Sequence, residues 1–142
     1  MEIQLRVINA PSEFRAAPLR DRASVSTKAA FTTHYAAVSG EQEVAFVALD
    51  LPDHKRYFCV YELLVDPSHR CRGYGAAVIR KCREFATREG FEKICLKPWP
   101  IEAGGSEEKL RAWYTKLDFV QSPEQSDLME IVFTASPDEK IA

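Results

Sequence analysis

The sequence has little of what metal sites, disulfide frameworks and membrane segments require. It holds three histidines and four cysteines in 142 residues, and no two cysteines stand in a C-x-x-C pair. A zinc site is therefore not expected. No apolar run approaches the about 20 residues of a membrane-spanning helix, and residues 1–6 lack the apolar segment of a secretion signal. These absences predict a cytoplasmic protein without a metal, a disulfide framework or a membrane partner.

An excess of one charge sign is also missing. The chain has 19 Lys and Arg against 21 Asp and Glu, a net charge of −2. Nucleic acid is not expected as the main partner, because neutralising phosphates needs a basic surface. The length suits one domain. We expect that domain to cover residues 1–135 and residues 136–142 to form a flexible tail.

Apolar patterning predicts an α/β (α+β) domain with a sheet of six to seven strands. The segments rich in β-formers are residues 3–8, 31–38, 43–49, 57–65, 91–96, 119–121 and 128–134. The segments 31–38 and 43–49 are predicted to form a hairpin. The nearly unbroken apolar run 57–65 is typical of a central strand covered on both faces. The sheet is therefore expected to be mixed, because a strand–helix–strand unit follows that run.

Two helices are predicted after the central strand. One covers residues 75–89, with an apolar stripe and Gly90 as its C-terminal cap. The other begins after Ser106, which is expected to be its N-cap, and places Trp113 and Tyr114 on its apolar face. Residues 9–28 are expected to hold only a turn or two of helix, because Pro11 and Pro18 interrupt it.

The bend between the central strand and the first helix has the composition of an anion site. It reads Arg70-Cys71-Arg72-Gly73-Tyr74-Gly75-Ala76. Glycines allow close approach of the backbone, and the helix N-terminus adds about half a positive charge. Together with two arginines these features favour a bound phosphate group. The bend alone fits equally well a tight turn whose arginines face solvent.

Two wider patterns resemble the GNAT acetyltransferase superfamily. The first is Leu63-Leu64-Val65-Asp66-Pro67 followed by the bend, which is similar to the family's motif A. The second is Trp113-Tyr114 followed by Asp118-Phe119, where the family usually has Gly-Phe. The resemblance covers residues 30–133. It implies a single GNAT-like domain whose sheet splays apart at its centre, with acetyl-CoA in the split and a reduced N-terminal helical region.

The resemblance also assigns roles to residues. The pantetheine arm of the cofactor would pair with the backbone of Leu63, Leu64 and Val65. Its pyrophosphate would lie on the bend, held by Arg70, Cys71, Arg72, Gly73, Tyr74, Gly75 and Ala76. Ser106 is the nearest polar substitute for an Asn that many members carry after the fifth strand.

Catalysis requires a general acid and a general base. Tyr114 occupies the position of the family's usual acid, although periodicity alone makes it one more residue of an apolar helix face. Glu62 is the only acidic residue in the central strand and a candidate base; the alternative is that it faces solvent. The fifth strand offers no acid, and Asp118 stands where a positive φ is expected. The histidines are expected to lie on the surface.

The sequence therefore predicts an N-acetyltransferase that moves the acetyl group of acetyl-CoA to a primary amine of a small molecule, peptide or protein. The alternative is a catalytically inactive acyl-CoA-binding sensor or interaction module. Nucleic-acid binding through Arg70, Arg72, Arg80, Lys81 and Arg83 is the weakest reading. A homodimer is compatible with each of these functions. Cys71, set among arginines, is a hypothetical site of redox sensitivity.

Overall fold

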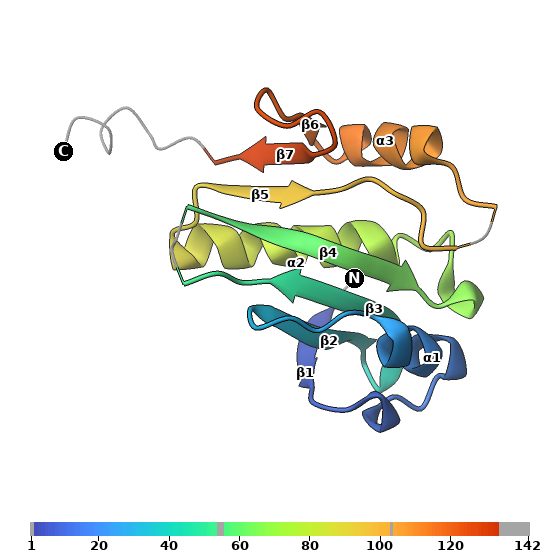
Figure 1. Ribbon diagram of the computed structural model, residues 1–142. Coiled ribbons are helices and arrows are strands. Elements are labelled where there is room, and N and C mark those ends of the chain that lie inside the picture. The colour runs from blue at the N-terminus through green and yellow to red at the C-terminus, as the bar shows by residue number, and fades with distance from the viewer. Residues whose placement is uncertain (1, 54–55, 103, 134–142) are drawn as a thin grey trace.

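The computed structural model describes residues 2–53, 56–102 and 104–133. They form one seven-stranded sheet in the order β1-β2-β3-β4-β5-β7-β6 (Figure 1). The strands are β1 (Gln4–Ile8), β2 (Thr32–Ser39), β3 (Gln42–Asp50), β4 (Tyr57–Val65), β5 (Lys93–Leu96), β6 (Val120–Gln121) and β7 (Met129–Val132). All neighbours are antiparallel except β4 and β5. The predicted mixed α/β (α+β) sheet is confirmed; the expected domain boundary at 135 and the tail 136–142 lie outside the described residues.

Helices cover both faces of this sheet. They are α1 (Ala17–Val25), α2 (Tyr74–Glu89) and α3 (Glu107–Lys116), with 3-10 turns at Pro11–Glu13 and Pro67–His69. In Figure 1, α2 passes behind the sheet and α1 lies in front of it. The larger core lies on the α2 side and also contains Tyr114 of α3, whereas the smaller core contains Leu19 and Ala23 of α1. None of the helices in the described part of the chain is long and apolar enough to cross a membrane.

The N-terminal helical region is reduced, as predicted, but Pro18 does not interrupt it. Pro18 stands within the first two positions of α1, where a missing N–H costs nothing and the fixed φ suits a helix. The buried carboxylate of Glu43 accepts hydrogen bonds from the backbone N–H groups of Arg15 and Ala16, both at 2.8 Å. This contact across 27 residues fixes the start of α1, and local patterning carried no sign of it.

The sheet splays at its centre because β5 is much shorter than β4. The parallel pairing runs from Tyr57 opposite Lys93 to Val60 opposite Leu96, where β5 ends. β4 continues for five residues and remains paired only with β3 on its other side. Within the described residues, the edge of β4 from residue 61 to 65 therefore has no neighbouring strand on the β5 side. The predicted central position of β4 and the splay beside it are both confirmed.

A β-bulge in β4 decides which side chains face which helix. The register with β3 shifts so that Ala48 lies opposite Glu62 and Leu49 opposite Val60, which leaves Tyr61 extra. Bulges of this kind re-aim side chains. As a result Tyr61 and Glu62 both face the α1 side, whereas Leu63 packs against the core on the α2 side.

Candidate functional site

The bend between β4 and α2 has the strained backbone of an anion cradle. Cys71 has φ 61° and Gly73, the N-cap of α2, has φ 83°. Two left-handed residues within three positions turn successive peptide groups in the same direction, a geometry that forms anion-binding concavities. The first amides of α2 have no acceptor inside the helix. The side chain of Asp66 accepts a hydrogen bond from the Ser68 N–H at 3.0 Å and closes the turn before the bend.

Gly75 has a different role from Gly73. A Cβ on Gly75 would lie 3.0 Å from Cζ2 and 3.1 Å from Cη2 of Trp113. The missing side chain therefore lets the start of α2 pack directly on α3. This contact brings the bend and the second family signature together, although 38 residues separate them in the sequence.

One cavity of about 560 Å³ joins the bend to the splay and to α3. Every residue that the sequence predicted for the site lines it except Arg72, which is exposed on the bend. The predicted residues in the lining are Glu62, Leu63, Leu64, Val65, Arg70, Cys71, Gly73, Tyr74, Gly75, Ala76, Ser106 and Tyr114. Sequence reasoning missed other lining residues, among them Tyr61, Lys97 and Lys109. They lie in β4, just after β5 and on α3 respectively, and none of the three belongs to a motif.

Arg70 connects two walls of the cavity. Its Nε donates to the carbonyl oxygen of Val65 at 3.2 Å, and its Nη2 bonds Glu102 on the loop after β5. The guanidinium is therefore held between the end of β4 and the opposite wall. Both side chains are partly exposed, at 38% and 50%, so this ion pair contributes little to stability and leaves Arg70 available to an anion.

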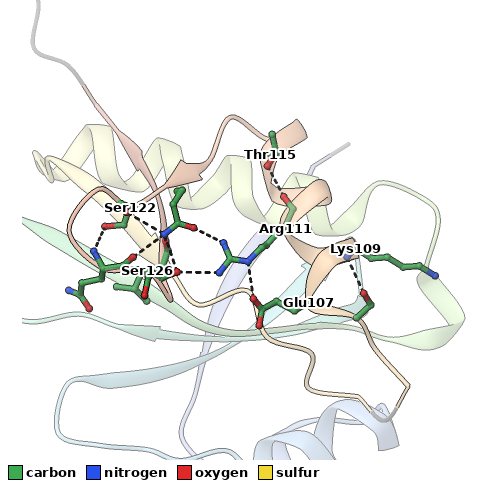
Figure 2. Close-up of polar contacts among 10 residues, drawn as sticks. Glu107, Lys109, Arg111, Thr115, Ser122 and Ser126 are labelled. Atoms are coloured by element: carbon green, nitrogen blue, oxygen red, sulfur yellow. Dashed lines mark hydrogen bonds and ion pairs between the residues drawn. The ribbon is translucent and has the colours of Figure 1, made fainter.

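Ser106 is the N-cap of α3, as predicted. Its hydroxyl oxygen accepts from the Lys109 N–H at 3.2 Å. Figure 2 shows how the rest of α3 is fixed: Arg111 donates to Glu107 at 2.9 Å and to the carbonyl oxygen of Ser126 at 3.4 Å. These contacts tie α3 to the segment between β6 and β7, and so hold the turn that carries Tyr114.

Tyr114 lies in the core and lines the cavity. Its ring packs edge-on against Trp113 at 4.9 Å and Phe119 at 5.7 Å between centroids. Burial, which leaves 8% of the residue exposed, raises the pKa of Tyr114 to about 12. The phenol therefore carries its proton throughout the neutral range. Asp118, just after α3, has φ 75°, as the position was expected to require.

Glu62 is buried rather than solvated. Its carboxylate accepts hydrogen bonds on both oxygens, from Nη2 of Arg22 and from the hydroxyl of Ser26. The side chain of Glu62 is 1% exposed and that of Arg22 24%. The interpretation that Glu62 points to solvent is wrong, because the bulge turns it toward α1. Charge compensation by Arg22 makes the buried carboxylate tolerable.

The histidines do not share one environment. His34 is buried against Phe46, and burial lowers its pKa, so the expected surface position is wrong for this residue. His69 lines the cavity and lies 3.3 Å from Oε1 of Gln42. His54 lies outside the described residues. No group of three or more His, Cys, Asp or Glu among the described residues is arranged to hold a metal ion.

The arrangement just described matches a known family. A family model described as "Acetyltransferase (GNAT) domain" matches residues 30–121, well over half of the chain. The chain belongs to the GNAT acetyltransferase family. The match spans β2 to β6 and includes the bend, the splay and α3. No curated protein sequence matches this GNAT chain.

Solved structures share the GNAT fold over nearly the whole chain. The KacTA–DNA complex has a TM-score of 0.69 at 16% identity, over 92% of this chain and 93% of that one. The ribosomal-protein-S18-alanine N-acetyltransferase from Escherichia coli has a TM-score of 0.65 at 12% identity, over 96% and 98%. The PaiA N-acetyltransferase from Thermoplasma acidophilum, solved with coenzyme A, has a TM-score of 0.61 at 11% identity, over 94% and 100%. At these identities the likeness is one of fold.

Proposed function

We propose that this GNAT protein is an N-acetyltransferase that moves the acetyl group of acetyl-CoA directly to a primary amine of a small molecule, peptide or protein. The observation that carries the proposal is the single cavity that joins the bend, the unpaired edge of β4 and the phenol of Tyr114. Acetyl-CoA has three matching parts: a diphosphate, an arm with amide groups and a thioester. Family membership and the coenzyme A in the similar PaiA structure support the choice of cofactor.

The residues of the cavity fit that cofactor part by part. The diphosphate would take the amides from Cys71 to Ala76, with Arg70 and Arg72 beside it, because the left-handed residues and the start of α2 already form a cradle. The arm would pair with the backbone of residues 63–65, as an added strand does. Ser106, although it caps α3, borders the same space.

The proton transfers would fall to Tyr114 and Glu62. Tyr114 keeps its proton at neutral pH and so can give it to the departing thiolate through close positioning rather than strong acidity. Glu62 is the only carboxylate of β4 at the cavity and would accept the amine proton through a water molecule. The guanidinium of Arg22 would fix its orientation.

The exchange Tyr114→Phe tests this function. It removes the phenol but keeps the ring that packs on Trp113 and Phe119. We expect kcat for release of free CoA to fall by about 10²-fold or more, the range of general acid catalysis, with the Kd for acetyl-CoA unchanged by calorimetry. Tyr35→Phe, in β2 and away from the cavity, is the matched control. Undiminished turnover in Tyr114→Phe would remove Tyr114 from the reaction.

A catalytically inactive acyl-CoA-binding sensor or interaction module is the second candidate. Two observations favour it: both oxygens of Glu62 are engaged, by Arg22 of α1 and by Ser26 just after α1, and β5 carries no acid. This module would bind acetyl-CoA yet release no free thiol with any amine. A panel of small amines, peptides with a free N-terminus and lysine peptides separates the two functions, provided that acetyl-CoA binding is measured on the same preparation.

A further inference from the structure

Two cysteines lie directly opposite each other where β4 and β5 pair. The parallel register places Cys59 beside Cys95. The same row continues to Asp50 on β3 and to Glu130 on β7, so two thiols stand side by side between two carboxylates. Their neighbours Phe58 and Val60 face the α2 core. The thiols therefore face the opposite side of the sheet, outside the cofactor cavity described above.

The spacing of paired strands suits a covalent link between these thiols. Neighbouring strands lie about 4.8 Å apart, which falls inside the Cα separation of about 4.4–6.8 Å found for disulfides. The two side chains leave the sheet on the same face, because residues directly opposite each other in the register point the same way. Cys59 is half-buried, whereas Cys95 is 5% exposed.

The two thiols are chemically unequal. The neighbouring thiol of Cys59, and next the ammonium of Lys93, lower the pKa of Cys95, against opposing effects of burial and of Glu130 and Glu124. The neighbouring thiol of Cys95, with burial and the nearby carboxylate of Asp50, raises the pKa of Cys59. Cys95 is therefore the thiol that ionises first, and the thiolate is the nucleophilic form.

We propose that Cys59 and Cys95 form an oxidisable thiol pair that a peroxide converts into a disulfide between β4 and β5. The thiolate of Cys95 attacks an oxygen of hydrogen peroxide, and the O–O bond breaks to give a sulfenic acid and a hydroxide. The hydroxide takes up the proton that Cys95 released on ionisation and leaves as the first water. The sulfur of Cys59 then attacks that of Cys95; the S–O bond breaks and a second water leaves with the Cys59 proton. Two thiols lose two hydrogens in total, and the peroxide is reduced to two waters.

The position of this pair connects it to the splay. Val60 and Leu96, the last residues paired before the strands separate, follow Cys59 and Cys95 immediately. The disulfide would tie β4 to β5 at the base of the split. The proposal does not depend on the acetyltransferase function, because it concerns only this pair and its reaction with a peroxide.

Peptide mapping after oxidation tests the proposal directly. The folded full-length chain is treated with hydrogen peroxide, quenched with catalase, denatured, alkylated with N-ethylmaleimide and cleaved with trypsin. We expect the tryptic peptide from Tyr57 to Arg70 to be joined to the peptide that begins at Ile94. The mass of the linked pair should lie two hydrogens below the summed masses of the two free peptides, and a thiol reductant should separate the two peptides again.

The other two cysteines serve as internal controls. Cys82 is fully buried on the α2 side and Cys71 is exposed on the bend. The link should persist in Cys82→Ser and Cys71→Ser and disappear in Cys59→Ser and Cys95→Ser. If Cys59 and Cys95 both remain alkylated at a peroxide dose that oxidises Cys71, or if Cys59 is joined only to Cys71, the proposal is overturned. Because the wild-type chain gives the primary result, poor folding of a variant does not affect the test.

Discussion

Glu62 and Glu43 are two buried carboxylates with distant cationic partners and different surroundings. Glu62 bonds Arg22 and Ser26 of the α1 region and borders the cavity. Glu43 bonds Arg6 and the amides that start α1, and does not line the cavity. Both are costly to bury unless paired. Comparing exchanges at Glu62 and at Glu43 therefore separates the structural role of a buried carboxylate from a catalytic role.

The exchange Glu62→Gln keeps the side-chain size and removes the charge. Because Arg22 would lose its ionic partner, we expect the free energy of unfolding in urea to fall by about 1–3 kcal/mol. If Glu62 also accepts the amine proton, kcat should fall as well. Glu43→Gln should lose similar stability and keep kcat. Equal kcat in both variants and the wild type would leave Glu62 with a structural role alone.

At the level of elements, the site depends on how α3 meets α2. The indole of Trp113 lies against Gly75 at the start of α2, and its neighbour Tyr114 projects into the core and borders the cavity. Arg111 fixes the outer face of α3 to the segment before β7. A shift of α3 would therefore displace Tyr114 from the bend.

Gly75→Ala tests this contact. The new Cβ would lie about 3.0 Å from the six-membered ring of Trp113, and overpacking of this kind costs about 1–3 kcal/mol. We expect the free energy of unfolding and kcat both to fall. In a Trp113→Phe background the same exchange should cost less, because the smaller ring leaves room, and a double-mutant cycle measures the difference. If the two exchanges have additive effects on the free energy of unfolding, the contact between Gly75 and Trp113 does not limit the packing of α2 on α3.

The elements that the sequence predicted correctly are those with local signals. β4 shows an unbroken β-forming run, α2 an apolar stripe ended by Gly90, and α3 a serine cap. The features that the sequence did not predict depend on contacts between residues that are far apart in the chain. Pro18 reads as a helix breaker until Glu43 is seen to bind the amides before it. Residue spacing does not encode strand register, so the bulge that buries Glu62 could not be predicted.

In the whole molecule, the two parts of the sheet separate beside β4, and the site occupies the separation. β1 to β4 form one antiparallel part, and β5, β7 and β6 the other (Figure 1). The bend lies at the end of β4, while α3 lies beyond the end of β5. The sheet thus brings the bend and the protonated phenol of Tyr114 to the same cavity, although neither part of the sheet holds both.

The most direct test of this account is a titration of the isotope-labelled protein followed through its backbone amide resonances. Coenzyme A should shift the amides of residues 71–76 and those of residues 63–65. Pantetheine, which lacks the diphosphate, should shift only residues 63–65. The account is contradicted if saturating coenzyme A leaves the amides of residues 71–76 unchanged, or if pantetheine shifts them to the same extent.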